Sequence, residues 1–560
     1  MWIQTTNGAS AARLLTAVQL AGIALAMADS PPLAYWPMDG SGADASTNAW
    51  HASTSGVTWV SGAGAALDGR TAHLEVPAAA ALQLGVSDFT VALWMRVHPD
   101  SGASSGDLVS WYDPVRRQGF NLGLQDQSGT CTSMANTRNL FFGMDAGTEP
   151  RWTDCGRPGN NRMVFALSVH AGDLYAGTFE HGAEEAGRVH RYAGGTDWED
   201  CGAPDRCNTV SALGVFRGQL HAGVARYSGV GSHLAPSPNE APGGRVYRYA
   251  GDRRWEDCGR PAGADVVWGM TVFKDALHVS VMDLPPRHLT TPRQGVYRYA
   301  GGTRWIWCGN PGGRLAPLTV VGGHLFAGGF NGGTLGGVFR YEGGTNWSAW
   351  GSPPQVDQTY SFAVHRGVLH AGTWKEGRVY RFPGPGQWED AGRLGSELEV
   401  MGLTHFNGKL YGGTLPLAQV YRQDEGGWTL TGRLDFSETE YRRAWSTAVY
   451  QGRLFCGTLP SGHVHALEAG VAISHDAALP DGWHHVAATR EAGRLSLHVD
   501  GRLAAQSKPF PSGDFALHAG VPLRLGFGEG GRFRGNLREV RLYRRALTAG
   551  EVDALMKDTR

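Results

Sequence analysis

One short pattern recurs along the middle of this chain and restricts the possible folds more than any other feature. It reads RVHRYAGGTDWEDCG at residues 188–202, RVYRYAGDRRWEDCG at 245–259 and GVYRYAGGTRWIWCG at 295–309. Alignment on its tryptophan gives seven units with tryptophans 40 to 57 residues apart: Trp152, Trp198, Trp255, Trp305, Trp347, Trp388 and Trp428. Self-similarity at such a period indicates a fold built from one repeated supersecondary unit.

Each unit contains four runs that read as short strands. Two of them flank a tight turn, as in FALSVHAGDLYAGT at residues 165–178, and a third run of the GRVYRY type leads into the tryptophan run. The 82 glycines of the chain fall mainly in such turns. Four short strands in each unit are typical of a β-propeller blade, so the pattern predicts seven blades.

The phase of the repeat predicts how the ring closes. The first unit supplies only the strand around Trp152, and the last unit ends at GHVHAL, residues 462–467, without a tryptophan strand. We therefore expect the Trp152 strand to pair with the strand around Val464, which leaves no open sheet edge between the ends of the ring.

The repeated motif is predicted to have a structural role and not a catalytic one. A catalytic group is needed once, whereas the arginine of V-x-R-Y recurs in six units. Across adjoining strands these arginines are expected to form modest ion pairs with the aspartates of W-E-D and W-T-D. The arginines are Arg191, Arg248, Arg298, Arg340, Arg381 and Arg422, and the aspartates are Asp154, Asp200, Asp257 and Asp390.

The segments on either side of the repeat, residues 33–148 and 468–560, read as two halves of one domain. The second half contains DGWHHVAATR and LSLHVDG within 481–501, and RGNLREVRLYRRALTAGEV at 534–552. The first half contains YWPMDG at 35–40 and LDGRTAHLEVP at 67–77. Together they resemble a laminin-G-like jelly roll of the concanavalin A-like superfamily.

This resemblance implies an all-β fold in which a jelly-roll sandwich carries an inserted seven-bladed β-propeller, residues 149–467. Residues near Tyr35 should then share a sheet with residues near Leu542. Related jelly rolls often hold calcium, and Asp44, Asn48 and Asp68 are the candidate ligands. Because Ca²⁺ takes six or more oxygen ligands, these three side chains do not complete a site, and plain turns remain the alternative.

The seven cysteines do not form a metal-binding pattern, since no C-x-x-C pair occurs. Cys155, Cys201, Cys258 and Cys308 share one repeat position that later units fill with tryptophan, alanine or threonine, which indicates a packing position. Cys201 and Cys207 are close enough in sequence to form a local disulfide in an oxidising compartment.

Residues 1–28 read as a signal peptide. An apolar run follows Arg13 and ends at Ala26-Met27-Ala28, a small-x-small cleavage pattern. We therefore expect a secreted, periplasmic or cell-surface protein with no membrane span in the mature chain. The formal net charge of -1 gives no general attraction to nucleic acid.

Loop length predicts which face of the propeller binds ligand. The turns inside the strand doublets are tight, whereas the long loops 225–244, 282–295 and 330–337 all fall on the opposite face. The chain enters and leaves on the tight-turn face, so the jelly roll should dock there and leave the loop face free. Aromatic and polar residues on that face suit a glycan, with ordinary loop decoration as the alternative: Phe179, Glu180, His181, Arg226, Asp283, Phe330, Asn331, Trp374, Lys375 and Glu376.

No catalytic motif stands out, because H-E-x-x-H, G-x-S-x-G and the phosphate-binding loop are all missing from the sequence. The leading hypothesis is a non-enzymatic binding protein that recognises glycans or extracellular proteins through the propeller loop face, the jelly roll or both. A glycan-active hydrolase or lyase with its site in the propeller mouth is the alternative, and a purely structural surface or adhesion component is the third.

Overall fold

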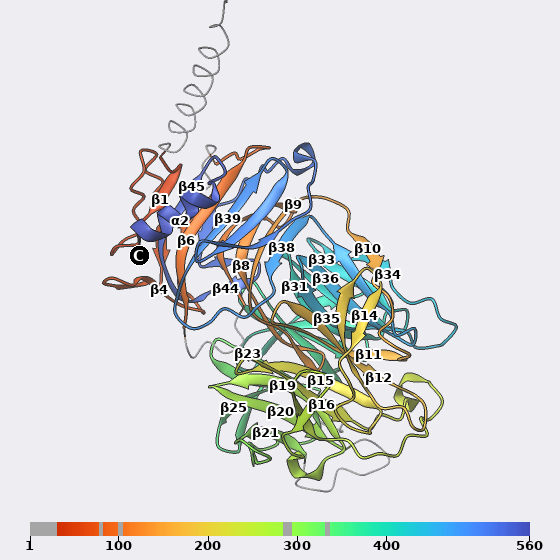
Figure 1. The fold of residues 1–560 in the computed structure, drawn as a ribbon. Helices are drawn as coiled ribbons and strands as arrows, with labels where there is room; N and C mark the ends of the chain where they lie inside the picture. The colour runs from red at the N-terminus through yellow and green to blue at the C-terminus, as the bar shows by residue number, and fades with distance from the viewer. Residues whose placement is uncertain (1–30, 78–81, 99–104, 284–293, 331–335, 560) are drawn as a thin grey trace, which may run out of the picture.

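The computed structural model describes residues 31–77, 82–98, 105–283, 294–330 and 336–559. These residues form two β domains (Figure 1). The jelly roll combines the red and orange N-terminal strands with the blue C-terminal strands, and the propeller contains the strands between them. The expected signal peptide lies outside the described residues, and none of the described helices is long and apolar enough to span a membrane.

The jelly roll consists of two sheets. The first contains, in spatial order, β3 (Thr58–Val60), β4 (Gly64–Asp68), β45 (Arg534–Tyr543), β6 (Phe89–Val97), β39 (Trp483–Glu491), β40 (Arg494–Val499) and β41 (Arg502–Gln506), with β1 (Ala34–Trp36) on β45. The second contains β2 (Ser53–Ser55), β5 (His73–Val76), β42 (Leu523–Leu525), β7 (Gly106–Asp113), β8 (Gln118–Thr130), β9 (Ser133–Ala146) and β38 (Val471–His475), with the short β43 (Phe527–Gly528) and β44 (Gly531–Arg532) beside β7. Helix α2 (Ala549–Asp558) follows β45 and begins with a capping box at Thr548.

Both halves of the chain contribute to one jelly-roll core. Tyr35 pairs with Arg541 across β1 and β45, and β39 pairs with β6 along its length. Trp36, Phe89 and Phe142 from the first half pack in the same buried cluster as Val486 and Leu542 from the second. The prediction of one domain interrupted by the propeller is confirmed.

The described strands of residues 151–468 form seven four-stranded antiparallel blades. Their strands are, for blade 1, β11 (Met163–His170), β12 (Asp173–Phe179), β13 (Val189–Gly194) and β14 (Asp197–Asp200); blade 2, β15 (Thr209–Phe216), β16 (Gln219–Ala225), β17 (Val246–Tyr249) and β18 (Trp255–Asp257); blade 3, β19 (Val266–Phe273), β20 (Ala276–Met282), β21 (Gly295–Tyr299) and β22 (Trp305–Trp307); blade 4, β23 (Leu315–Val321), β24 (His324–Gly329), β25 (Val338–Gly343) and β26 (Asn346–Gly351); blade 5, β27 (Gln358–His365), β28 (Val368–Trp374), β29 (Arg378–Gly384) and β30 (Gln387–Arg393); blade 6, β31 (Glu399–Phe406), β32 (Lys409–Leu415), β33 (Gln419–Asp424) and β34 (Gly427–Arg433); and blade 7, β35 (Arg443–Tyr450), β36 (Arg453–Leu459), β37 (Val464–Glu468) and β10 (Arg151–Asp154).

Blade 7 closes the ring as the phase of the repeat predicts. Its outermost strand, β10, comes from the start of the propeller, and Trp152 pairs with Leu467 of β37. The first and last propeller strands therefore share one sheet, which removes the free edge that each would otherwise expose.

The repeated tryptophan joins neighbouring blades. The indole of Trp198 donates to the carbonyl of Cys155 at 2.9 Å, and that of Trp255 donates to Cys201 at 3.0 Å. Trp305, Trp347 and Trp428 repeat the bond at the next junctions of the same kind. Two tryptophans differ: the indole of Trp152 donates to the hydroxyl of Thr431 at 3.3 Å, and Trp388 is 39% exposed.

The repeated arginines pair differently from the prediction. Arg191 and Arg248 form ion pairs with Glu199 and Glu256, the glutamates of W-E-D, because the register places each arginine directly opposite that glutamate. Asp200, Asp257 and Asp390 pair instead with the first arginine of R-V-x-R-Y, as Arg188 does with Asp200 at 2.6 Å, whereas Asp154 contacts His463. These pairs are largely exposed, so each contributes little to stability.

A hairpin of the jelly roll fills the propeller channel. Strands β8 and β9 run from the jelly roll into the ring (Figure 1), and residues 127–136 form what we call the channel hairpin. Asn136 exchanges two hydrogen bonds with the backbone of Val449 in blade 7, at 2.7 and 3.0 Å, and Gln127 donates to the carbonyl of His405 in blade 6 at 2.9 Å. Further hydrogen bonds reach blades 1, 2 and 4, and β8 lies against the first strands of blades 3 and 5.

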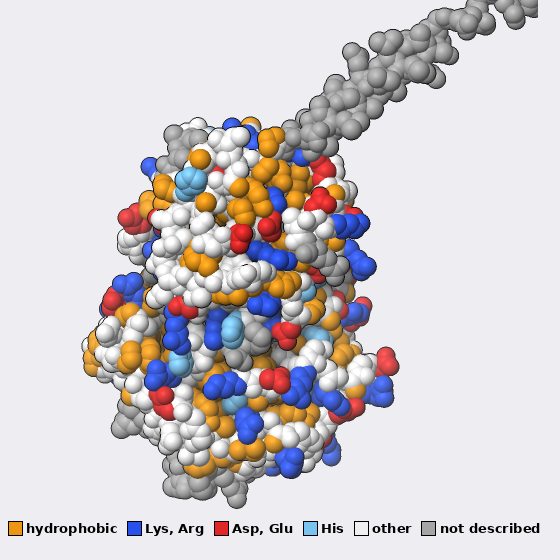
Figure 2. Space-filling model, turned by 90° about the vertical axis from the view of Figure 1, so that its left-hand side faces the viewer, with side chains coloured by type: hydrophobic (Ala, Val, Ile, Leu, Met, Phe, Trp, Pro, Cys, Tyr) orange, Lys and Arg blue, Asp and Glu red, His pale blue; other side chains and the backbone are white. Residues whose placement is uncertain are grey.

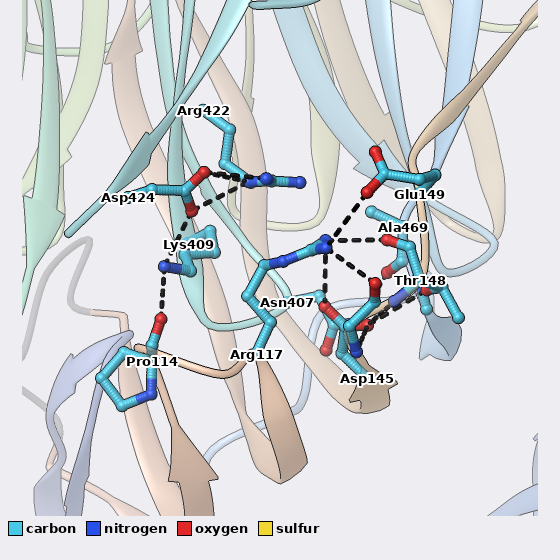
Figure 3. Close-up of polar contacts among 12 residues, drawn as sticks. Pro114, Arg117, Asp145, Thr148, Glu149, Asn407, Lys409, Arg422, Asp424 and Ala469 are labelled. Atoms are coloured by element: carbon cyan, nitrogen blue, oxygen red, sulfur yellow. Dashed lines mark hydrogen bonds and ion pairs between the residues drawn. The ribbon is translucent and has the colours of Figure 1, made fainter. Parts of the chain in front are cut away.

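The jelly roll docks on the tight-turn face, as expected from where the chain enters and leaves. Figure 3 shows Arg117 at the segment that enters the propeller, where it donates to the carbonyl of Thr148 at 2.7 Å. Asn407 in a tight turn of blade 6 donates to the carbonyl of Ala469 in the leaving segment at 2.8 Å. The ammonium group of Lys409 pairs with Asp424 of its own blade and donates to the carbonyl of Pro114 in the jelly roll.

The docking is incomplete at its margins. Clefts of about 390 and 510 Å³ lie between the domains, the first beside blades 5 and 6 and the second beside blades 2 and 3. Figure 2 shows several Lys and Arg side chains around a hollow where the domains meet. On this junction Arg70 of the jelly roll donates to the carbonyl of Gly322 in blade 4 at 2.9 Å.

Candidate functional site

The mouth of the propeller, on the face away from the jelly roll, is lined by residues from β-bulges. The innermost strand of every blade departs from regular pairing at one point, and the bulged residues are Phe165, Ser211, Trp268, Ala316, Tyr360, Met401 and Trp445. A bulge makes a side chain point in a direction that the regular in-and-out alternation of the strand would not give it. All of these residues except Ser211 join one buried cluster around Cys131, at the tip of the channel hairpin.

The aromatic members of this cluster contact one another edge to face. Phe165 lies 5.3 Å from Trp445 and 5.7 Å from Trp268 between ring centroids, and Tyr360 lies 6.0 Å from Trp445. The jelly roll thus supplies the floor of the mouth through Cys131, and the bulges supply its wall.

A second ring stands above the bulges, at the ends of the second strands. It consists of Phe179, Ala225, Met282, Phe330, Trp374, Leu415 and Leu459, one residue from each blade. Trp374 is the one member of this ring that is only partly buried. Three residues expected on the binding face, Phe179, Phe330 and Trp374, therefore lie together in this upper ring.

Four consecutive blades add polar side chains at the same level. Two residues before the bulge, blades 4 to 7 place Arg314, Gln358, Glu399 and Arg443, which we call the polar arc; blades 1 to 3 have Met163, Thr209 and Val266 there. No member of the polar arc is more than 8% exposed. Within the described part of the chain, each has a buried atom without a hydrogen-bond partner: Arg314 Nε, Gln358 Oε1, Glu399 Oε2 and Arg443 Nε.

The polar arc and the aromatic wall form one environment. Burial raises the pKa of Glu399, and the nearby charge of Arg443 opposes that shift. The indole nitrogens of Trp268 and Trp445 also have no partner among the described residues. A buried donor or acceptor without a partner costs about 1–3 kcal/mol, so this concentration of such atoms is typical of a site completed by water or a ligand.

The remaining expected binding residues are engaged in local structure. Glu180 is buried, with its pKa raised to about 7 by that burial, and it accepts from Thr178. His181 contacts the carbonyl of Ala235 at 2.7 Å, Asp283 accepts from the backbone of Asp265, and Arg226 is partly buried beside the same segment. Lys375 pairs with Asp357 at 3.4 Å and Glu376 with Arg378 at 2.9 Å, whereas Asn331 lies outside the described residues.

The calcium candidates hold turns of the jelly roll. The carboxylate of Asp44 accepts from the backbone of Tyr35, Ser46 and Trp50, and Asn48 donates to the carbonyl of Leu33. Asp68 accepts from three backbone groups of its own turn, which lower its pKa to about 2 against the effect of burial. Among the described residues no three His, Cys, Asp or Glu are grouped to hold a metal, and calcium binding stays a prediction.

The expected disulfide is not formed. All seven cysteines are free and buried, and Cys201 and Cys207 pack as separate apolar side chains in one cluster between blades 1 and 2. Burial raises the pKa of both thiols. The Cys201 position follows the tryptophan strand in several blades, so its side chain is directed by the repeat into the interblade core.

Sequence reasoning missed the bulge residues, the polar arc and the channel hairpin. The bulge residues lie inside runs that read as ordinary strands. The available signal was their variability, since this one aligned position holds Phe, Ser, Trp, Ala, Tyr, Met and Trp while the framework positions around it repeat.

Known proteins resemble both parts of the chain. Residues 425–553 match the family model of the concanavalin A-like lectin/glucanases superfamily, laminin G type 3. Residues 425–468 of that match belong to propeller strands in the structure, and the rest to the jelly roll. The search of curated proteins found no match.

Solved structures resemble the propeller. Virginiamycin B lyase from Staphylococcus aureus is 8% identical with a TM-score of 0.40, covering 57% of this chain and 99% of that chain. The WD40 beta propeller domain of Doa1 is also 8% identical with a TM-score of 0.40, covering 57% and 97%. The extracellular domain of the one component system BT4673 from B. thetaiotaomicron is 14% identical with a TM-score of 0.39, covering 57% of this chain and 39% of that chain.

At these identities and TM-scores the solved structures say nothing of ligand or reaction. The architecture follows from the sheet topology, and the matched family model supports its jelly roll. The chain is an all-β protein in which a jelly roll, part of which matches the concanavalin A-like family model, carries an inserted seven-bladed β-propeller.

Proposed function

We propose that this protein is an extracellular binding protein that recognises a carbohydrate at the propeller mouth. The observation that carries the proposal is the polar arc, whose four unpartnered buried atoms lie at the level of the upper ring, next to the aromatic wall. Sugar hydroxyls both donate and accept hydrogen bonds, and the C–H faces of a sugar ring pack on aromatic faces. A saccharide therefore suits both halves of the mouth at once.

Binding is favoured over hydrolysis by the number of carboxylates. Glycoside hydrolysis commonly uses two carboxyl groups at a defined separation. Glu399 is the one carboxylate of the polar arc, and its neighbours in the arc are the amide of Gln358 and the guanidinium of Arg443. One carboxylate beside an arginine suits a site in which the carboxylate accepts hydrogen bonds from sugar hydroxyls.

The test is a glycan array with the mature chain, with and without calcium, followed by titration calorimetry on each glycan that binds. Trp374→Ala should weaken binding about several-fold to tenfold, since loss of an aromatic stacking partner costs about 0.5–1.5 kcal/mol beyond area burial. Trp388→Ala, in the outermost strand of the same blade, is the matched control and should bind as wild type does. Equal affinity of wild type and Trp374→Ala, with loss of binding in jelly-roll variants, would place the site on the other domain.

A further inference from the structure

A surface loop of blade 2 lies over one side of the mouth. Residues 227–237, which we call the strap, follow β16 and contain the short 3-10 helix η2 (Val230–Ser232). The strap closes on itself, because the backbone N–H of Ser237 donates to the carbonyl of Ser228 at 2.8 Å. It is therefore a compact surface loop whose ends lie close together.

The inner side of the strap covers the aromatic wall. The ring of Tyr227 stands edge-on to Phe165 at 5.3 Å and to Phe179 at 5.2 Å between centroids. Leu234 packs on the same cluster. The bulge residues and the polar arc beside them are buried, so a ligand reaches them only if a covering segment moves.

The outer side of the strap is held mainly by polar contacts to two other blades. In blade 1, His181 contacts the carbonyl of Ala235 at 2.7 Å and accepts at its own carbonyl from Ser237 at 2.8 Å. In the loop before blade 7, Glu440 pairs with His233 at 2.7 Å, and the His233 ring lies 4.1 Å from that of Tyr441. Exposed ion pairs of this kind are weak, so the contact can open and close readily.

One member of the polar arc is shared with the strap. Arg443 donates to the carbonyl of Gly231 at 2.9 Å and also to the hydroxyl of Ser232. Its remaining nitrogen, Nε, has no partner within the described part of the chain. When the strap is in place, two of the three guanidinium nitrogens are therefore occupied by the strap rather than by a ligand.

We propose that the strap is a lid on the mouth, fastened to blade 7 by the His233–Glu440 pair and by Arg443. Opening uncovers the aromatic wall and frees the terminal nitrogens of Arg443, so that strap and ligand compete for the same guanidinium. The identity of the ligand rests on the proposed function, whereas the opening of the strap does not.

The experiment needs no ligand, because Cys131 reports on the mouth. Its thiol lies in the mouth cluster with 0% exposure. We would measure the rate at which iodoacetamide alkylates Cys131 in the native full chain, by peptide mass spectrometry, together with hydrogen exchange of residues 228–237. Cys456, also 0% exposed but inside the sheets of blades 6 and 7, is the internal control thiol.

Two surface variants should open the strap. His233→Ala and Glu440→Gln each remove the same ion pair, and both should raise strap exchange and Cys131 alkylation about three- to tenfold while leaving Cys456 unchanged. Glu438→Gln, an exposed carboxylate two residues away without an ion pair among the described residues, is the matched control and should behave as wild type. Faster strap exchange with unchanged Cys131 alkylation would overturn the proposal, as would wild-type rates in both variants.

A glycan that binds the mouth separates this proposal from the proposed function. Bound glycan should slow Cys131 alkylation in wild type, and its association rate should rise in His233→Ala. If Cys131 responds to the variants but no glycan binds, the lid stands and the carbohydrate proposal fails. If a glycan binds with one association rate in wild type and both variants, the lid proposal fails and the binding function stands.

Discussion

Removal of one side chain from the channel hairpin tests whether the two domains unfold as one unit. Asn136 is 1% exposed, and its amide both donates to and accepts from the backbone of Val449 in blade 7, at 2.7 and 3.0 Å. Asn136→Ala leaves a buried N–H and a buried C=O of Val449 without these partners. Each buried group left without a partner costs about 1–3 kcal/mol, and the structure can relax in part. We therefore expect the free energy of unfolding to fall by about 2–4 kcal/mol.

The assay is equilibrium urea unfolding followed by tryptophan fluorescence and circular dichroism. Asn136→Ala should lower the midpoint with little change in slope, and both probes should report a single transition in wild type and variant. Asn160→Ala changes an exposed asparagine whose side chain donates to Glu185 at 3.4 Å, and it should change stability by less than about 0.5 kcal/mol. Equal stability of the two variants, or two separated transitions in wild type, would refute the view that the hairpin joins the domains into one cooperative unit.

Three further predictions follow from the packing. Trp198→Ala should lower the free energy of unfolding by about 3–5 kcal/mol, because its ring packs between blades 1 and 7 and its indole donates to the carbonyl of Cys155. Trp388→Ala should lower it far less, and urea unfolding of both variants measures the difference. Burial lowers the pKa of His405 to about 3, below its unfolded value of about 6.5. The folded protein therefore loses stability as the pH falls below about 6.5, because only the unfolded chain takes up a proton at this residue. His405→Gln should reduce this decline between pH 6.5 and 4.5 by up to about 1.4 kcal/mol per pH unit. Thiol titration of the unfolded protein without reductant should give seven thiols, and five would indicate a disulfide.

The ring and the split jelly roll were predictable because their signals are repeated or local. Five of the seven repeated tryptophans make the same kind of interblade bond, so one recurring residue specifies a series of similar junctions. The halves of the jelly roll carry strand patterns that read independently of each other, such as the run that contains His484 and His485 in β39. Neither inference required knowledge of which distant residues touch.

The mouth depended on contacts between distant residues, which the sequence does not display. The segment 127–136 reads QSGTCTSMAN, a polar stretch without the alternation of a half-buried strand. Several of its polar side chains bond to the backbones of separate blades, for example Gln127 to His405 and Asn136 to Val449. Binary patterning recognises burial against apolar neighbours, so it reads such a segment as an exposed loop.

The same hairpin determines what kind of site the propeller can offer. A ring with an open channel could bind along its axis from either face, but here the jelly roll fills the axis and its tip, Cys131, forms the floor of the mouth. Strands β8 and β9 continue from this tip, through several register shifts between Gln125 and Thr130, into the second sheet of the jelly roll. There Phe120 of β8 and Phe142 of β9 belong to the jelly-roll core. A displacement of the floor therefore has to be accommodated in the packing of the jelly roll, since close-packed cores transmit strain. For this reason ligand binding at the mouth and the stability of the jelly roll should be coupled, although no strand of the jelly roll other than this pair reaches the mouth among the described residues.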